Sequence, residues 1–186
     1  MPLDAPIFEG YYGGSLSDQS TFDRLYETVS TRFQGRSDVE IMRNDTISAY
    51  GDLRNRYGQS FDFIYVDANH NYEYVLRDLL YYQHLLAHDG VIMLNDCNHS
   101  MNSIQMNLGV LEAVGNFIKR SEFIPVAMTN NDGSDLVIAR EGSQMAKALD
   151  AALDASDLFV VEVPPQLLPA VHVCFRPNGG TFISFR

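Results

Sequence analysis

Two short, nearly continuous apolar segments, each followed by polar residues, constrain the fold of this chain more than any other feature. Residues 61–67 read FDFIYVD and residues 90–96 read GVIMLND. Segments that are apolar on both faces are typical of parallel strands covered by helices on each side. Between them, residues 71–88 carry apolar side chains at helical spacing, and Asp89-Gly90 is expected to end that helix. The middle of the chain therefore predicts a strand–helix–strand crossover unit.

Similar patterns extend in both directions from this unit. We expect helices at residues 18–33, 46–57, 103–120 and 143–155, and strands at 38–43, 122–129, 134–140, 157–163 and 171–186, the last with a turn at 177–180. The prediction is one α/β domain over residues 1–186. Its sheet is expected to be doubly wound, Rossmann-like and mostly parallel, with helices on both faces and an antiparallel C-terminal hairpin.

Charge and composition limit the partners that this chain could have. The net charge of its 186 residues is −11, and no cluster of Lys or Arg interrupts that acidity. We therefore expect neither a nucleic acid nor a membrane surface as partner. No apolar segment reaches membrane-spanning length, the first residues lack a signal-peptide pattern, and Cys97 and Cys174 lie far apart. The expectation is a reduced, cytoplasmic protein.

Polar side chains follow both of the central predicted strands. Asp67 and His70 come after the first, and Asn95 and Asp96 come after the second. If the two strands are neighbours, these side chains converge beyond the carboxyl ends of the sheet, where ligands bind in open α/β folds. Carboxylates and amides suit a divalent cation, and a carboxylate or imidazole can take a proton from a hydroxyl. The ordinary alternative is that each aspartate caps a helix and that the histidine lies at the surface.

The segment FDFIYVDANHNYEYVLRDLLYYQHLLAHDGVIMLNDC resembles a segment of the class I S-adenosylmethionine-dependent methyltransferases. In that family an Asp-Gly-x-His turn follows one strand, and one or two acidic residues follow the next. The similarity, to the small O-methyltransferase branch, covers about residues 5–141 and leaves 142–186 as a C-terminal helix and strand extension. It implies methyl transfer to the hydroxyl of a small molecule. It also implies catalytic roles for Asp67 and His70, and Mg²⁺ or another divalent cation bound by Asp67, Asn95 and Asp96.

The family binds its methyl donor through a Glu-x-Gly-x-x-x-Gly-x-Ser turn, and this sequence has no full copy of it. Residues 9–15 read EGYYGGS, which is one residue short. Either this is the donor turn and a later strand is missing, or residues 6–9 are the second strand and the first strand is missing. The second alternative fits the spacing of the downstream matches. The donor contacts implied by the resemblance are Glu9, Gly13, Asp45 and Asp67.

Three functions remain open from the sequence. The first is an O-methyltransferase. The second is a truncated or degenerate methyltransferase fold that acts as a non-catalytic binding or assembly module. In that case the hairpin at residues 172–186 could pair with a partner or with a second copy to form a homo-oligomer, because exposed edge strands invite such pairing. The third is metal-dependent hydrolysis by the Asp, Asn and His side chains. Binding of the methyl donor separates the first function from the other two.

Overall fold

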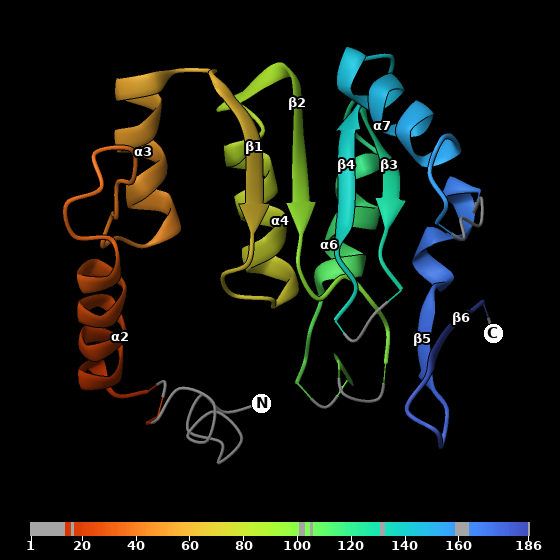
Figure 1. Cartoon of the computed structure of the whole chain (residues 1–186), viewed down its shortest axis with the longest axis horizontal. Helices are drawn as coiled ribbons and strands as arrows, with labels where there is room; N and C mark the ends of the chain where they lie inside the picture. The colour runs from red at the N-terminus through yellow and green to blue at the C-terminus, as the bar shows by residue number, and fades with distance from the viewer. Residues whose placement is uncertain are drawn as a thin grey trace. The chain divides into compact units, whose positions relative to one another are not determined.

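The computed structural model describes residues 14–15, 17–100, 103–104, 106–130, 133–158 and 164–185. The chain divides into two compact units, residues 1–49 and 50–186, which are described separately. One domain over the whole chain therefore stays a prediction. The elements, drawn in Figure 1, are α2 (Gln19–Arg32), α3 (Thr46–Tyr57), β1 (Phe61–Val66), α4 (Tyr72–Tyr82), β2 (Leu86–Leu94), α6 (Val110–Ile118), β3 (Phe123–Met128), β4 (Leu136–Arg140), α7 (Gln144–Asp154), the 3₁₀ helix η1 (Pro165–Ala170), β5 (His172–Phe175) and β6 (Thr181–Ser184).

The N-terminal unit contains helix α2, which the sequence predicted. The helix begins after Asp18, whose carboxylate accepts a hydrogen bond from the backbone N–H of Ser20 at 2.9 Å. The strand predicted at residues 38–43 is wrong, because residues 39–43 take up no regular secondary structure. A strand needs a hydrogen-bonded neighbour, and within the described part of the chain nothing pairs with this segment.

A four-stranded sheet in the order β1-β2-β4-β3 organises the second unit. Strands β1 and β2 are parallel, whereas β4 is antiparallel to both β2 and β3. The α/β class is therefore confirmed, but the sheet is mixed, and a mostly parallel Rossmann-like sheet is not confirmed. The predicted C-terminal hairpin is confirmed as β5 and β6, which pair antiparallel in a separate two-stranded sheet.

Alternating side chains of the strands give the sheet two apolar faces. Ile92 and Leu94 are fully buried in the larger core, with side chains from α4 and α6. Val91, the residue before Ile92, packs with Ala139 of β4 and Ala146 of α7. Because successive strand residues point to opposite faces, α4 and α6 cover one face and α7 lies on the other (Figure 1). The prediction of helices on both faces is confirmed.

Several predicted boundaries were wrong by a few residues. Helix α4 ends at Tyr82 and β2 already begins at Leu86, so Asp89-Gly90 lies within the strand instead of ending the helix. Gly90 is needed there, because a Cβ atom would lie 2.8 Å from the Leu86 side chain and 2.9 Å from the carbonyl oxygen of Phe61. The strand predicted at 157–163 falls mostly outside the described residues. None of the described helices is long and apolar enough to cross a membrane.

Candidate active site

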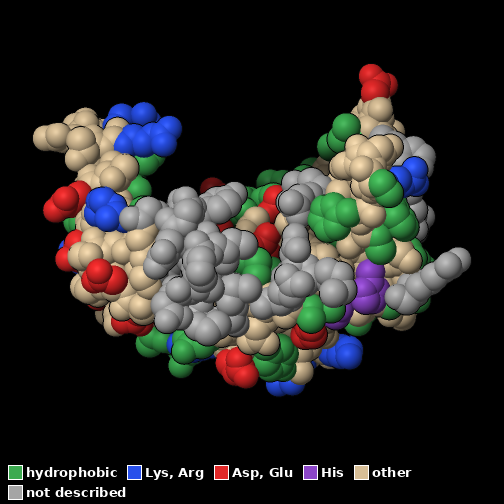
Figure 2. Space-filling model, turned by 90° about the horizontal axis from the view of Figure 1, so that it is seen from below, with side chains coloured by type: hydrophobic (Ala, Val, Ile, Leu, Met, Phe, Trp, Pro, Cys, Tyr) green, Lys and Arg blue, Asp and Glu red, His purple; other side chains and the backbone are tan. Residues whose placement is uncertain are grey.

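The carboxyl ends of β1 and β2 bring the predicted polar residues together. The two strands pair in parallel with Val66 opposite Leu94, so Asp67 and Asn95 leave the sheet at the same level. The backbone N–H of Asn95 donates to the carbonyl oxygen of Val66 at 3.1 Å, which keeps the strands aligned to their ends. Figure 2 views the molecule from the side where these strands end and shows Asp and Glu side chains at the surface there.

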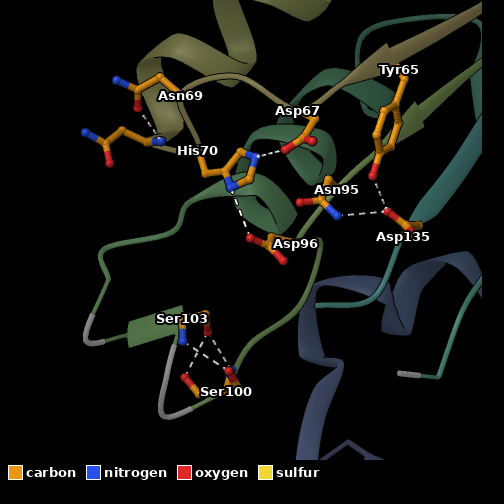
Figure 3. A network of polar contacts seen from close by, with 10 residues as sticks. Tyr65, Asp67, Asn69, His70, Asn95, Asp96, Ser100, Ser103 and Asp135 are labelled. Carbon is orange, nitrogen blue, oxygen red and sulfur yellow. Dashed lines mark hydrogen bonds and ion pairs between the residues drawn. The ribbon is translucent and has the colours of Figure 1, made fainter. Parts of the chain in front are cut away.

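His70 lies between the two predicted carboxylates (Figure 3). Its Nε2 atom is 3.4 Å from Oδ1 of Asp67, and its Nδ1 atom is 3.2 Å from Oδ2 of Asp96. The His70 side chain is only 13% exposed, whereas that of Asp67 is 51% exposed. A ligand that approaches from solvent therefore meets the Asp67 carboxylate first, with the imidazole behind it.

The backbone on both sides of His70 is held in place. The side-chain oxygen of Asn69 accepts a hydrogen bond from the N–H of Asn71 at 3.0 Å, which closes the turn before α4. The carbonyl oxygen of His70 accepts a hydrogen bond from the N–H of Gly109 at 2.8 Å. Gly109 is the residue just before α6, so this bond ties the His70 turn to the start of that helix.

Asp96 occupies a backbone conformation that few residues other than glycine adopt. Its φ angle is 53°, and such conformations often mark functional sites. Gly133 packs against it so closely that a Cβ atom at this position would lie 2.7 Å from Oδ1 of Asp96. The next residue, Cys97, donates its N–H to the carbonyl oxygen of Ser134 at 2.8 Å. Segments before β4 and after β2 thus fix the Asp96 carboxylate together.

Asp135, which sequence reasoning missed, is a third carboxylate at this edge. Its Oδ1 atom accepts hydrogen bonds from the hydroxyl of Tyr65 at 3.0 Å and from the side-chain amide of Asn95 at 3.1 Å. Asp135 directly precedes β4, which pairs antiparallel with β2, so the start of β4 lies beside the end of β2. The turn at residues 130–133 was a visible signal, but its position next to β2 could not be read from the sequence.

The environment changes the acidity of three of these groups. Burial raises the pKa of the Asp67 carboxyl, and the negative charges of Asp96 and Asp135 add to this, while His70 opposes it. Burial and the hydrogen bond to Asp135 raise the pKa of the Tyr65 hydroxyl. Burial also raises the pKa of the Cys97 thiol far above its usual range, so this cysteine stays protonated and unreactive.

Residues 9–97 match the sequence model of a family described as a methyltransferase domain. This segment includes the His70 turn, both strands of the site and the Asn95-Asp96 pair. The match, which covers just under half of the chain, supports the predicted resemblance of this segment to the class I S-adenosylmethionine-dependent methyltransferases. No curated protein matches it in sequence.

The methyl-donor contacts implied by the resemblance fare differently in this structure. Glu9 and Gly13 lie outside the described residues. Asp45 caps α3: its Oδ1 atom accepts from the N–H groups of Ile47 and Ser48 at 3.0 and 3.1 Å, and its Oδ2 atom accepts from the Ser48 hydroxyl at 2.8 Å. These bonds also lower the pKa of its carboxyl. Capping of α3 therefore accounts for the position of the Asp45 carboxylate without a bound methyl donor.

The predicted divalent-cation site finds no support among the described residues. Asp67 and Asp96 face different nitrogen atoms of one imidazole, so the ring of His70 separates them. The side-chain NH₂ group of Asn95 donates to Asp135, which fixes the orientation of its amide. Within the part of the chain that the structure describes, no group of three or more His, Cys, Asp or Glu residues could hold a metal ion.

Proposed function

We propose that this protein transfers a methyl group from S-adenosylmethionine to the hydroxyl oxygen of a small molecule, and that Asp67 and His70 accept the hydroxyl proton. The family match supports methyl transfer in general. The observation that supports the choice of a hydroxyl is the arrangement of an exposed carboxylate backed by a mostly buried imidazole just beyond the end of β1. A hydroxyl must lose its proton to become a good nucleophile, and these side chains provide a place for it.

The donor fits the charge of this edge of the sheet. When bound, S-adenosylmethionine supplies a methyl group on a positively charged sulfur. Among the described residues, Asp67 and Asp96 both pair with His70, and Asp135 accepts neutral hydrogen-bond donors, so negative charge remains at the strand ends. Parallel strands joined by a helix, as β1 and β2 are by α4, are the unit from which Rossmann-like sheets are built. We take this pair as part of a Rossmann-like donor-binding sheet.

The side chains of the protein itself would divide the work as follows. Asp67 takes the hydroxyl proton, because it is the exposed carboxylate and because its raised pKa makes it a stronger base than an ordinary aspartate. His70 stabilises the carboxylate from behind and can share the proton through Nε2, which faces Oδ1 of Asp67 at 3.4 Å and has no hydrogen-bond partner among the described residues. Asp96 holds the far side of the imidazole and so fixes its orientation. The acceptor is then placed for in-line attack, to which correct positioning contributes most of the rate.

Calorimetric titration with S-adenosylmethionine and its demethylated product tests the first half of this proposal. Binding at micromolar concentrations is the expected result. A folded sample that binds neither compound would overturn the proposal and would instead favour a non-catalytic binding or assembly module in the cytoplasm. The titration is repeated with magnesium, because the proposed reaction does not depend on it.

Product formation with a panel of small phenols, catechols and sugars tests the second half. The variants are Asp67→Asn and His70→Gln, which keep the size of the side chain but change its ability to accept a proton. We expect each to lower kcat by about 10²–10⁴-fold, the usual contribution of general base catalysis. The matched control is Asp62→Asn, an exposed carboxylate elsewhere on β1. If His70→Gln retains wild-type kcat, the proton-accepting role of this pair is wrong.

A further inference from the structure

We propose that the imidazole of His70 keeps divalent cations out of the Asp67–Asp96 pair, so that the site operates with a side chain in the place of a metal ion. This inference rests on the proposed function only for the identity of the site, because its test measures ion binding and not methyl transfer. It follows from the way in which one ring contacts both carboxylates.

The first argument is the position of the ring. Nε2 faces Oδ1 of Asp67 at 3.4 Å, and Nδ1 faces Oδ2 of Asp96 at 3.2 Å. The two nitrogen atoms lie on different sides of an imidazole, so the carboxylates approach it from different directions (Figure 3). Magnesium binds oxygen at about 2.0–2.1 Å, so two oxygens that share one ion lie within about 4 Å of each other. The ring occupies the space that such an ion would need.

The second argument is that the ring is not free to leave. Its side chain is 13% exposed, and its Nε2 atom is buried. The backbone carbonyl oxygen of His70 accepts a hydrogen bond from the N–H of Gly109 at 2.8 Å, and a Cβ atom on Gly109 would lie 2.7 Å from the backbone nitrogen of Tyr72. The start of α6 therefore packs directly against the backbone that carries the imidazole, which leaves the ring little room to rotate away.

The third argument concerns the remaining oxygen ligand. Asn95 was the third predicted ligand, but its amide group is oriented by a hydrogen bond to Asp135 at 3.1 Å. This bond uses the side-chain NH₂ group, so it holds Oδ1, the atom that would bind a cation, in one orientation. Removal of the His70 ring would leave Asp67 and Asp96 facing one space, and a hard cation could bind there with water completing its shell.

The test is Mn²⁺ binding to the full chain, measured from the loss of the free-ion signal in electron paramagnetic resonance. The proteins are the wild type, Asp96→Asn, His70→Ala and the double variant His70→Ala/Asp96→Asn. We expect His70→Ala to bind Mn²⁺ at least about tenfold more tightly than the wild type, a gain of about 1.4 kcal/mol. The double variant is expected to lose this gain. The control is His84→Ala, which removes an exposed histidine and should change nothing.

Two results would overturn the inference. One is tight Mn²⁺ binding by the wild type that Asp96→Asn abolishes, because the ion and the imidazole would then share the site. This measurement needs no histidine variant, so it decides the question even if His70→Ala does not fold. The other is a folded His70→Ala protein, judged by its circular dichroism and melting curve, that binds no more Mn²⁺ than the wild type. Failure of methyl transfer would leave both readouts unaffected, so the two proposals fail separately.

Discussion

Gly109→Ala should damage both the stability of the protein and the geometry of the site through a single methyl group. The added Cβ would lie 2.7 Å from the backbone nitrogen and 2.9 Å from the Cα atom of Tyr72, whereas ordinary contacts begin near 3.4 Å. The backbone must therefore move by about 0.7 Å, since backbone atoms cannot rotate away as a side-chain end can. Overpacking of a buried position costs about 1–3 kcal/mol. For a chain of this size, that predicts a fall in Tm of about 3–10 °C.

The same displacement should reach His70, which lies two residues before Tyr72 and accepts the Gly109 hydrogen bond. Misplacement of a reacting group by about 1 Å can cost about 100-fold in rate, so we expect kcat to fall by roughly 10- to 100-fold. The matched control is Gly115→Ala in the same helix, where the nearest atom, on Pro169, would be 3.8 Å away. The free energy of unfolding of that variant should rise by about 0.5–1 kcal/mol, because alanine is a better helix former than glycine. Calorimetric melting curves of both variants test the predicted changes in stability. Equal Tm changes would refute the reasoning.

Two further predictions concern charged groups. Folding raises the pKa of Asp67 above its ordinary value of 3.8. Ionisation of Asp67 therefore lowers the free energy of unfolding, fully at pH values above the folded-state pKa and not at all well below 3.8. Asp67→Asn should therefore have a higher Tm than the wild type at pH 7.5, and the difference in Tm should shrink as the pH is lowered. A lower Tm for the variant at pH 7.5 would contradict the stated pKa shift. Arg140 is buried and donates to the carbonyl oxygens of Gln83, Ala87 and His88, so Arg140→Met should lower the free energy of unfolding in urea by about 2–4 kcal/mol. The exposed Arg120→Met should change it by less than about 0.5 kcal/mol, and equal losses in the two variants would show that these hydrogen bonds contribute little.

The parts of the fold that were predictable are those determined by local pattern. The apolar segments at residues 61–67 and 90–96 became neighbouring strands, and the helical spacing at 46–57 became α3 with those bounds. The end of α4 could not be predicted, because Leu85 and Leu86 continue the helical spacing of apolar residues although the chain has already turned toward β2. Here burial of both leucines in the core outweighed local helical preference.

The site shows the same division between local and long-range information. Asp67 and Asp96 were predictable because they come one and two residues after neighbouring strands, and strand pairing brings such residues to the same edge of the sheet. Asp135 depends on an antiparallel pairing between segments about 40 residues apart, so its role was not visible in its own surroundings. The position of the His70 ring between two carboxylates depends in turn on the backbone bond to Gly109. Position after two neighbouring strands predicts that oxygen ligands will gather, but the packing of α6 against the His70 turn determines whether an ion or an imidazole lies between them.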